Sequence, residues 1–135
     1  MELVIDANIL MSSLIKTKGF TYDLIFNEKI RLYAPEYLLQ EFEEHKEEIL
    51  EKSKLTNDEL KLFLSLTSYK IEFIPYIEFE EFIDEASKIT PDIDDTEYFA
   101  LALKINCSIW SNDRKLKEQT KINVYSTDEL KDKIK

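Results

Sequence analysis

The sequence predicts an α/β domain with a mostly parallel sheet of four or five strands that helices cover on both faces. Short apolar segments alternate with helical ones, at residues 2–5, 31–34, 71–76, 107–110 and 122–125. Such alternation is typical of parallel sheets. The segments ELVI and CSIW are apolar without a polar face, as expected for strands buried on both sides. A length of 135 residues fits one domain over residues 1–135.

Glycine and proline indicate where helices in the first half of the chain begin or end. Residues 8–16 and 20–28 flank Gly19, the only glycine, and are predicted to form two helices. Pro35 suits the first position of a helix, so we expect a helix to begin there and to run to about residue 53.

Later elements follow from capping residues. A helix over 57–68 is expected to begin after Thr56 or Asn57. Because proline lacks an N–H group, Pro75 either ends the third strand or places it at a sheet edge. Further helices are expected at residues 78–89, 93–106 and 114–119, and after Ser126 or Thr127.

The composition excludes several kinds of site. One glycine cannot supply a glycine-rich phosphate or dinucleotide loop. One cysteine and one histidine exclude a zinc site of those residues and an internal disulfide, so a cytoplasmic location is expected. No apolar run approaches the ~20 residues of a membrane span. The net charge of −10 argues against nucleic-acid binding by bulk charge, although acids can hold metal ions.

Aspartates follow two of the predicted strands. Asp6 follows ELVI, and Asp113 follows CSIW after Ser111 and Asn112. Each aspartate alone is readily explained as a helix cap. The carboxyl ends of parallel strands share one edge, where sites form in open α/β sheets. Both acids are therefore candidate site residues.

A third acid comes from the segment that begins at Pro91. On a helical wheel Asp95 lies within an apolar face, whereas Asp94 falls about 100° to one side. A core-facing carboxylate is costly unless it is paired or binds a metal. The wheel favours Asp95, and Asp94 stays open as the alternative.

The helix expected after Pro35 contains seven glutamates, most of which belong to a solvated face. Glu41 lies at the border of its apolar arc, with Glu48 as the second choice. His45 falls inside that arc and is predicted to be a core residue rather than a ligand.

If Asp6, Glu41, Asp95 and Asp113 converge, cations must offset their repulsion. Two like charges ~4 Å apart repel by about 4 kcal/mol at an effective dielectric near 20. Carboxylate oxygens suit Mg²⁺ or Mn²⁺. Such clusters commonly support metal-assisted phosphoryl transfer.

These features in this order resemble a PIN-domain nuclease over essentially the whole chain. The resemblance rests on Val4-Ile5-Asp6-Ala7-Asn8, a helix with an inward Glu41, Asp95 with Ala100 five residues on, and Ser111-Asn112-Asp113. It implies a three-layer α/β/α sandwich and RNA cleavage by metal-activated water. Asp6, Glu41, Asp95 and Asp113 would be the catalytic and metal-binding quartet, and Asn8, Ser111 and Asp94 would support it.

The resemblance also suggests partners. Many small members are toxins of VapC-type toxin–antitoxin pairs and are homodimers, so an antitoxin and a second copy are expected. Because the chain is acidic, local bases would have to attract RNA, and the candidates are Lys16, Lys18, Arg114 and Lys115. The alternative is a catalytically silent PIN-like module that binds RNA or protein.

Overall fold

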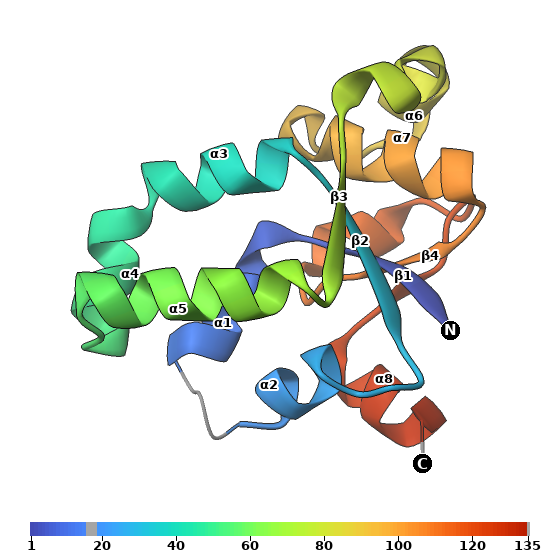
Figure 1. Ribbon diagram of the computed structural model, residues 1–135. Coiled ribbons are helices and arrows are strands. Elements are labelled where there is room, and N and C mark those ends of the chain that lie inside the picture. The colour runs from blue at the N-terminus through green and yellow to red at the C-terminus, as the bar shows by residue number, and fades with distance from the viewer. Residues whose placement is uncertain (16–18, 135) are drawn as a thin grey trace.

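The computed structural model describes residues 1–15 and 19–134, and its centre is a five-stranded sheet (Figure 1). The sheet order is β3-β2-β1-β4-β5, and every neighbouring pair is parallel. The predicted α/β class and the parallel sheet are therefore confirmed. The strands are β1 (Glu2–Ile5), β2 (Arg31–Pro35), β3 (Ile71–Ile74), β4 (Ser108–Trp110) and β5 (Val124–Tyr125).

Helices flank this sheet on both sides. Figure 1 shows α6 and α7 above the sheet, α1, α2 and α8 below it, and α3 to α5 at the left of the view. Helix α7 packs against β1, β2 and β4. The α-helices are α1 (Ala7–Ile15), α2 (Phe20–Ile25), α3 (Tyr37–Glu44), α4 (Lys46–Ser53), α5 (Asn57–Ser68), α6 (Ile83–Ile89), α7 (Thr96–Ile105) and α8 (Thr127–Ile134).

Short 3₁₀ helices fill several connections. They are η1 (Tyr76–Glu78), η2 (Glu80–Phe82), η3 (Ile93–Asp95) and η4 (Arg114–Glu118). The expected helix over 78–89 is thus α-helical only in its second half. Among the described residues, no helix has both the length and the apolar character that crossing a membrane requires.

The predicted helix start at Pro35 is wrong. Pro35 is the last residue of β2, where it pairs in register with Ile74 of β3. The next backbone N–H, that of Glu36, donates to the Ile74 carbonyl at 3.0 Å. Because this N–H continues the ladder, a proline without one is tolerated at the strand end. Pro75 directly follows β3, which ends at Ile74 and lies at one edge of the sheet.

The long helix expected from Pro35 to residue 53 is two helices. Its backbone changes direction at His45 (φ −103°, ψ 10°), which ends α3 and precedes α4. The prediction that His45 is a core residue is wrong, because its side chain is 49% exposed. The helical wheel assumed one continuous helix through His45. Because α3 ends and α4 begins there, the two helices have no common apolar face in which His45 could lie.

The core lies on both faces of β1, whose Leu3, Val4 and Ile5 are fully buried. From β1 the chain turns to β2 on one side, and β4 later joins β1 on the other. The strand order therefore reverses between β1 and β4. In sheets of this kind ligands bind at the carboxyl ends of the strands where the order reverses. Asp6 follows one of these two ends and Ser111 follows the other.

Candidate functional site

Asp6 lies at the reversal point and is only 5% exposed. Its Oδ1 accepts a hydrogen bond from the Ile9 N–H at 3.0 Å, so the carboxylate caps the start of α1. The Ser111 hydroxyl also donates to the Asp6 side chain. The residue thus has the capping role expected of an aspartate after a strand, but it performs that role while buried beside the end of β4.

Burial raises the pKa of Asp6 to about 6. The hydrogen bonds from Ser111 and Ile9 act against this rise, because they favour the charged carboxylate. The negative charges of Glu41 and Asp113 raise the pKa further. The carboxylate is therefore held in place by donors, yet its charge is poorly compensated.

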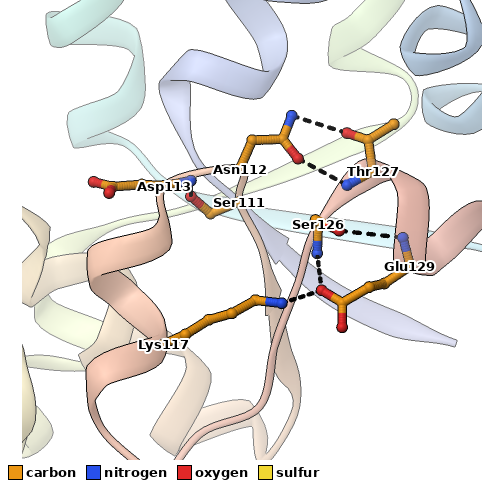
Figure 2. Close-up of polar contacts among 7 residues, drawn as sticks. All are labelled: Ser111, Asn112, Asp113, Lys117, Ser126, Thr127 and Glu129. Carbon is orange, nitrogen blue, oxygen red and sulfur yellow. Dashed lines mark hydrogen bonds and ion pairs between the residues drawn. The ribbon is translucent and has the colours of Figure 1, made fainter.

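Asp113 is fixed by the turn that follows β4. Its backbone N–H donates to the Ser111 hydroxyl oxygen at 3.1 Å, and its Oδ1 accepts from the Lys115 N–H at 3.0 Å (Figure 2 shows the Ser111 contact). Ser111 itself is buried. A single serine hydroxyl thereby connects the Asp6 carboxylate to the backbone of Asp113.

The same turn is tied to the start of α8. Asn112 accepts a hydrogen bond from the Thr127 N–H at 2.8 Å and donates to the Thr127 hydroxyl at 3.1 Å (Figure 2). The Trp110 indole N–H donates to the same hydroxyl at 3.1 Å. Lys117 also forms an ion pair with Glu129 of α8. These contacts fix the backbone that carries Ser111 and Asp113.

Asp95 ends η3 and precedes α7, where it is half-buried. Burial is the largest cause that raises its pKa to about 7, followed by the negative charge of Asp6 and then those of Asp92, Asp113 and Glu41. Asp94 is exposed, and its N–H donates to Asp92 Oδ1 at 3.0 Å. Of the two neighbouring aspartates, Asp95 is the one whose charge interacts with Asp6.

Glu41 is half-buried on α3. Its Oε1 accepts a hydrogen bond of 2.5 Å from the hydroxyl of Tyr98, which is only 1% exposed on α7. Burial raises the pKa of Glu41, and the Tyr98 hydrogen bond opposes that rise. The negative charge of Glu41 acts on both Asp6 and Asp95.

The structure thus gathers Asp6, Glu41, Asp95 and Asp113 close enough for their charges to interact. The ion pairs found among residues 1–15 and 19–134 are His45–Glu48, Lys52–Glu48 and Lys117–Glu129, and none includes these acids. Within the same residues, no three Asp, Glu, His or Cys side chains are grouped tightly enough to enclose one ion. The four acids nonetheless supply only oxygen donors, and no ion pair among the described residues neutralises them, a donor set that fits Mg²⁺ or Mn²⁺.

Asn8 and Glu48 line a pocket that none of the four acids lines. Asn8 is exposed on α1, and His45 lines the same pocket. Glu48 is exposed on α4, with its Oε1 2.6 Å from the Lys52 ammonium. Lys16 and Lys18 lie outside the described residues.

The two remaining basic candidates are close to one acid. Arg114 and Lys115 are exposed at the start of η4, directly after Asp113. The pocket beside this turn is lined by Arg114, Lys117 and Asp113, among others. The position of both bases permits contact with a ligand that reaches Asp113.

Tyr98 is the site residue that sequence reasoning missed. The helical wheel that places Asp95 within an apolar face places Tyr98 on that face too. A buried tyrosine usually finds a hydrogen-bond partner for its hydroxyl. That rule, together with its position three residues after Asp95 on the same helix, is the signal that could have linked it to the acids.

The comparisons with known proteins identify the family. The model of the PIN domain family matches residues 4–133. The chain belongs to the PIN domain family. The family expected from the order of the acidic motifs is therefore confirmed. No curated protein matches the chain in sequence.

One solved structure with the PIN fold is VapBC2 from Rickettsia felis, bound to a DNA fragment from its promoter. The matched chain is 16% identical to this protein, and the TM-score is 0.62. The match covers 93% of this chain and 98% of the other. The likeness extends over nearly the whole of both chains and shows that they share a fold.

Proposed function

We propose that this protein is an endoribonuclease that depends on Mg²⁺ or Mn²⁺ and hydrolyses phosphodiester bonds. One observation carries the proposal. Carboxylates from four separate parts of the chain are close enough for their charges to interact, and the pKa values of Asp6 and Asp95 are raised to about 6 and about 7. Membership of the PIN domain family supports it.

The bound cation would be held by Asp6, Glu41, Asp95 and Asp113. It would supply positive charge that activates water and neutralises the leaving oxygen. The chain's own residues keep the ligands in position. Ser111 holds Asp6, the turn at Ser111–Asp113 holds Asp113, and the Tyr98 hydroxyl holds Glu41. Because these donors are already in place, little side-chain ordering is left to be done when substrate binds.

The substrate we propose is RNA, bound partly through local bases. Arg114 and Lys115 are exposed next to Asp113, where they would contact phosphates. The overall charge of −10 weakens non-specific binding to RNA. We therefore expect the enzyme to select its RNA substrates narrowly.

The likeness to a VapBC2 chain suggests a biological setting. We propose that the protein acts in the cytoplasm as the toxin of a toxin–antitoxin pair and forms a homodimer. Co-expression with the product of a neighbouring small gene would test the pairing. A stable complex that lacks ribonuclease activity is expected, whereas full activity in the presence of that product would contradict the toxin role.

The decisive experiment is cleavage of labelled single-stranded RNA with Mn²⁺ or with EDTA. Asp6→Asn and Asp113→Asn proteins are purified in parallel, and Asp58→Asn, an exposed acid at the start of α5, is the matched control. We expect metal-dependent cutting by wild type and by the control, and none by the two site variants. Equal cutting by all four proteins would indicate a contaminating nuclease and contradict the assignment.

A catalytically silent binding module is the second candidate. The observation that favours it is the lack, among the described residues, of three tightly grouped metal-ligating side chains. RNA or protein binding without cleavage, unchanged by Mn²⁺ and by Asp6→Asn, would establish this alternative.

A further inference from the structure

The hydrogen bond between Tyr98 and Glu41 links a proposed metal ligand to a buried hydroxyl that lies far from it in the sequence. It joins α7 to α3 across 57 residues of sequence, with the Tyr98 oxygen 2.5 Å from Glu41 Oε1. We infer that Tyr98 is a positioning residue. It holds Glu41 by one carboxylate oxygen, Oε1, and leaves the second oxygen free to bind a divalent cation, an inference that rests on the proposed function.

The two partners differ in how firmly they are anchored. Tyr98 is 1% exposed on α7, the helix that packs against β1, β2 and β4 at the centre of the sheet. Glu41 is half-buried on α3, one turn before that helix ends at Glu44. A glutamate has three side-chain torsions to restrict, and a nearby helix end adds backbone freedom. The anchored phenol therefore restricts the mobile carboxylate, and the reverse does not hold.

The chemistry of the bond suits this role. A tyrosine hydroxyl supplies one donor, and a carboxylate has two oxygens that accept. Tyr98 engages Oε1, and within residues 1–15 and 19–134 no hydrogen bond reaches Oε2. Ligating carboxylates are usually oriented by such hydrogen bonds from outside the ligand sphere, and loss of one typically reduces metal affinity or activity 10–100-fold.

Asp95 is connected to Tyr98 by helix α7. It precedes α7 by one residue, and Tyr98 follows three positions later. The charges of Glu41 and Asp6 both act on Asp95 and on Tyr98. The Tyr98 hydrogen bond thus ties a proposed ligand on α3 to the helix that begins directly after Asp95.

Tyr98→Phe tests the inference, because it removes one oxygen and keeps the ring. Mn²⁺ affinity is measured by titration followed by EPR, which also reports the ligand geometry of the bound ion. The full chain is used, and Tyr22→Phe is the matched control, since Tyr22 packs against Phe26 and Phe63 away from the acids. We expect Mn²⁺ affinity to fall about tenfold for Tyr98→Phe and to stay unchanged for Tyr22→Phe.

A structural role would give a different result. If the hydroxyl only satisfies a buried donor, Tyr98→Phe would change the metal-free melting temperature and leave the Mn²⁺ affinity and EPR spectrum as in wild type, which would overturn the inference. In a Glu41→Ala background, Tyr98→Phe should have no further effect on affinity, because its target is gone. An undiminished tenfold loss there would also overturn it.

The metal readout separates this inference from the proposed function. Tight Mn²⁺ binding by wild type with weaker binding by Tyr98→Phe supports the role of Tyr98 even if no RNA is cut. Equal binding by both proteins overturns that role while the nuclease stands. Failure of wild type to bind Mn²⁺ at millimolar concentration overturns both.

Discussion

The Ser111 hydroxyl donates a hydrogen bond to the carboxylate of Asp6 and thereby joins the ends of the two strands between which the sheet order reverses. Both residues are buried, at 1% and 5% exposure. The same hydroxyl oxygen accepts from the Asp113 N–H at 3.1 Å. Donor and acceptor functions of one serine are therefore both used between two of the proposed metal ligands.

Ser111→Ala is expected to reduce cleavage and Mn²⁺ affinity at least tenfold, because Asp6 and Asp113 lose their shared support. The unfolding free energy should fall by about 1–3 kcal/mol, since buried polar groups lose partners. RNA cleavage and urea unfolding measure the two effects. The control is Ser13→Ala, a buried serine whose hydroxyl donates within α1. Equal Mn²⁺ affinity of the two variants would contradict this role of Ser111.

The stability of the metal-free protein should fall as pH rises from about 4 to about 7. Asp6 and Asp95 ionise near 3.8 when unfolded, but only at about 6 and about 7 when folded. Between these values the folded state binds more protons, so raising the pH favours unfolding. Melting temperatures in EDTA across this range would show the decline, and Asp6→Asn should make it shallower.

Millimolar Mn²⁺ should reverse this decline at neutral pH, because a bound cation offsets the repulsion between ionised carboxylates. The rise in melting temperature should be absent from Asp6→Asn and present in Asp58→Asn. A rise of the same size in all three proteins would show that Mn²⁺ acts elsewhere.

Arg114→Ala and Lys115→Ala should raise KM for RNA with little change in kcat, because each removes a phosphate contact rather than a metal ligand. Each variant should also reduce the slope of the logarithm of the RNA-binding constant against the logarithm of the salt concentration by about one. Filter binding at several salt concentrations measures this slope. Lys61→Ala, which changes an exposed residue of α5, serves as the control. An unchanged slope for both site variants would place the RNA elsewhere.

Asn112→Ala should slow cleavage without removing any ligand. Asn112 makes two hydrogen bonds to Thr127, and these fix the turn that carries Asp113. We expect a loss of about tenfold in rate and a lower melting temperature. The double variant with Thr127→Val should lose less than the sum of the single losses, because both belong to one network. Strict additivity would argue against a shared network.

The sequence predicts the features that depend on local patterns. All five strands and the α5 cap are examples: Thr56 accepts from the Glu59 N–H at 3.1 Å, and the Glu59 carboxylate accepts from the Thr56 N–H in return. The strand ends then predict where Asp6 and Asp113 lie, because parallel strands share an edge. Here periodicity and capping suffice.

Features that depend on tertiary contacts escape such reasoning. Pro35 is compatible with a helix start and with a strand end, and only its pairing with Ile74 decides between them. The break at His45 leaves no glycine or proline in the sequence to mark it. The link from Tyr98 to Glu41 joins residues 57 positions apart, so no local pattern contains it.

The central position of β1 has a consequence for how the chain acquires its site during synthesis. Leu3 of β1 pairs with Ser108 of β4, so β1 cannot complete its pairing until β4 has been synthesised. Pairing over such a distance closes a long loop and is slow compared with local folding. A nascent chain therefore lacks the assembled acids until β4 and the turn after it have been translated, and a product that stops short of β4 has Asp6 without Ser111 or Asp113.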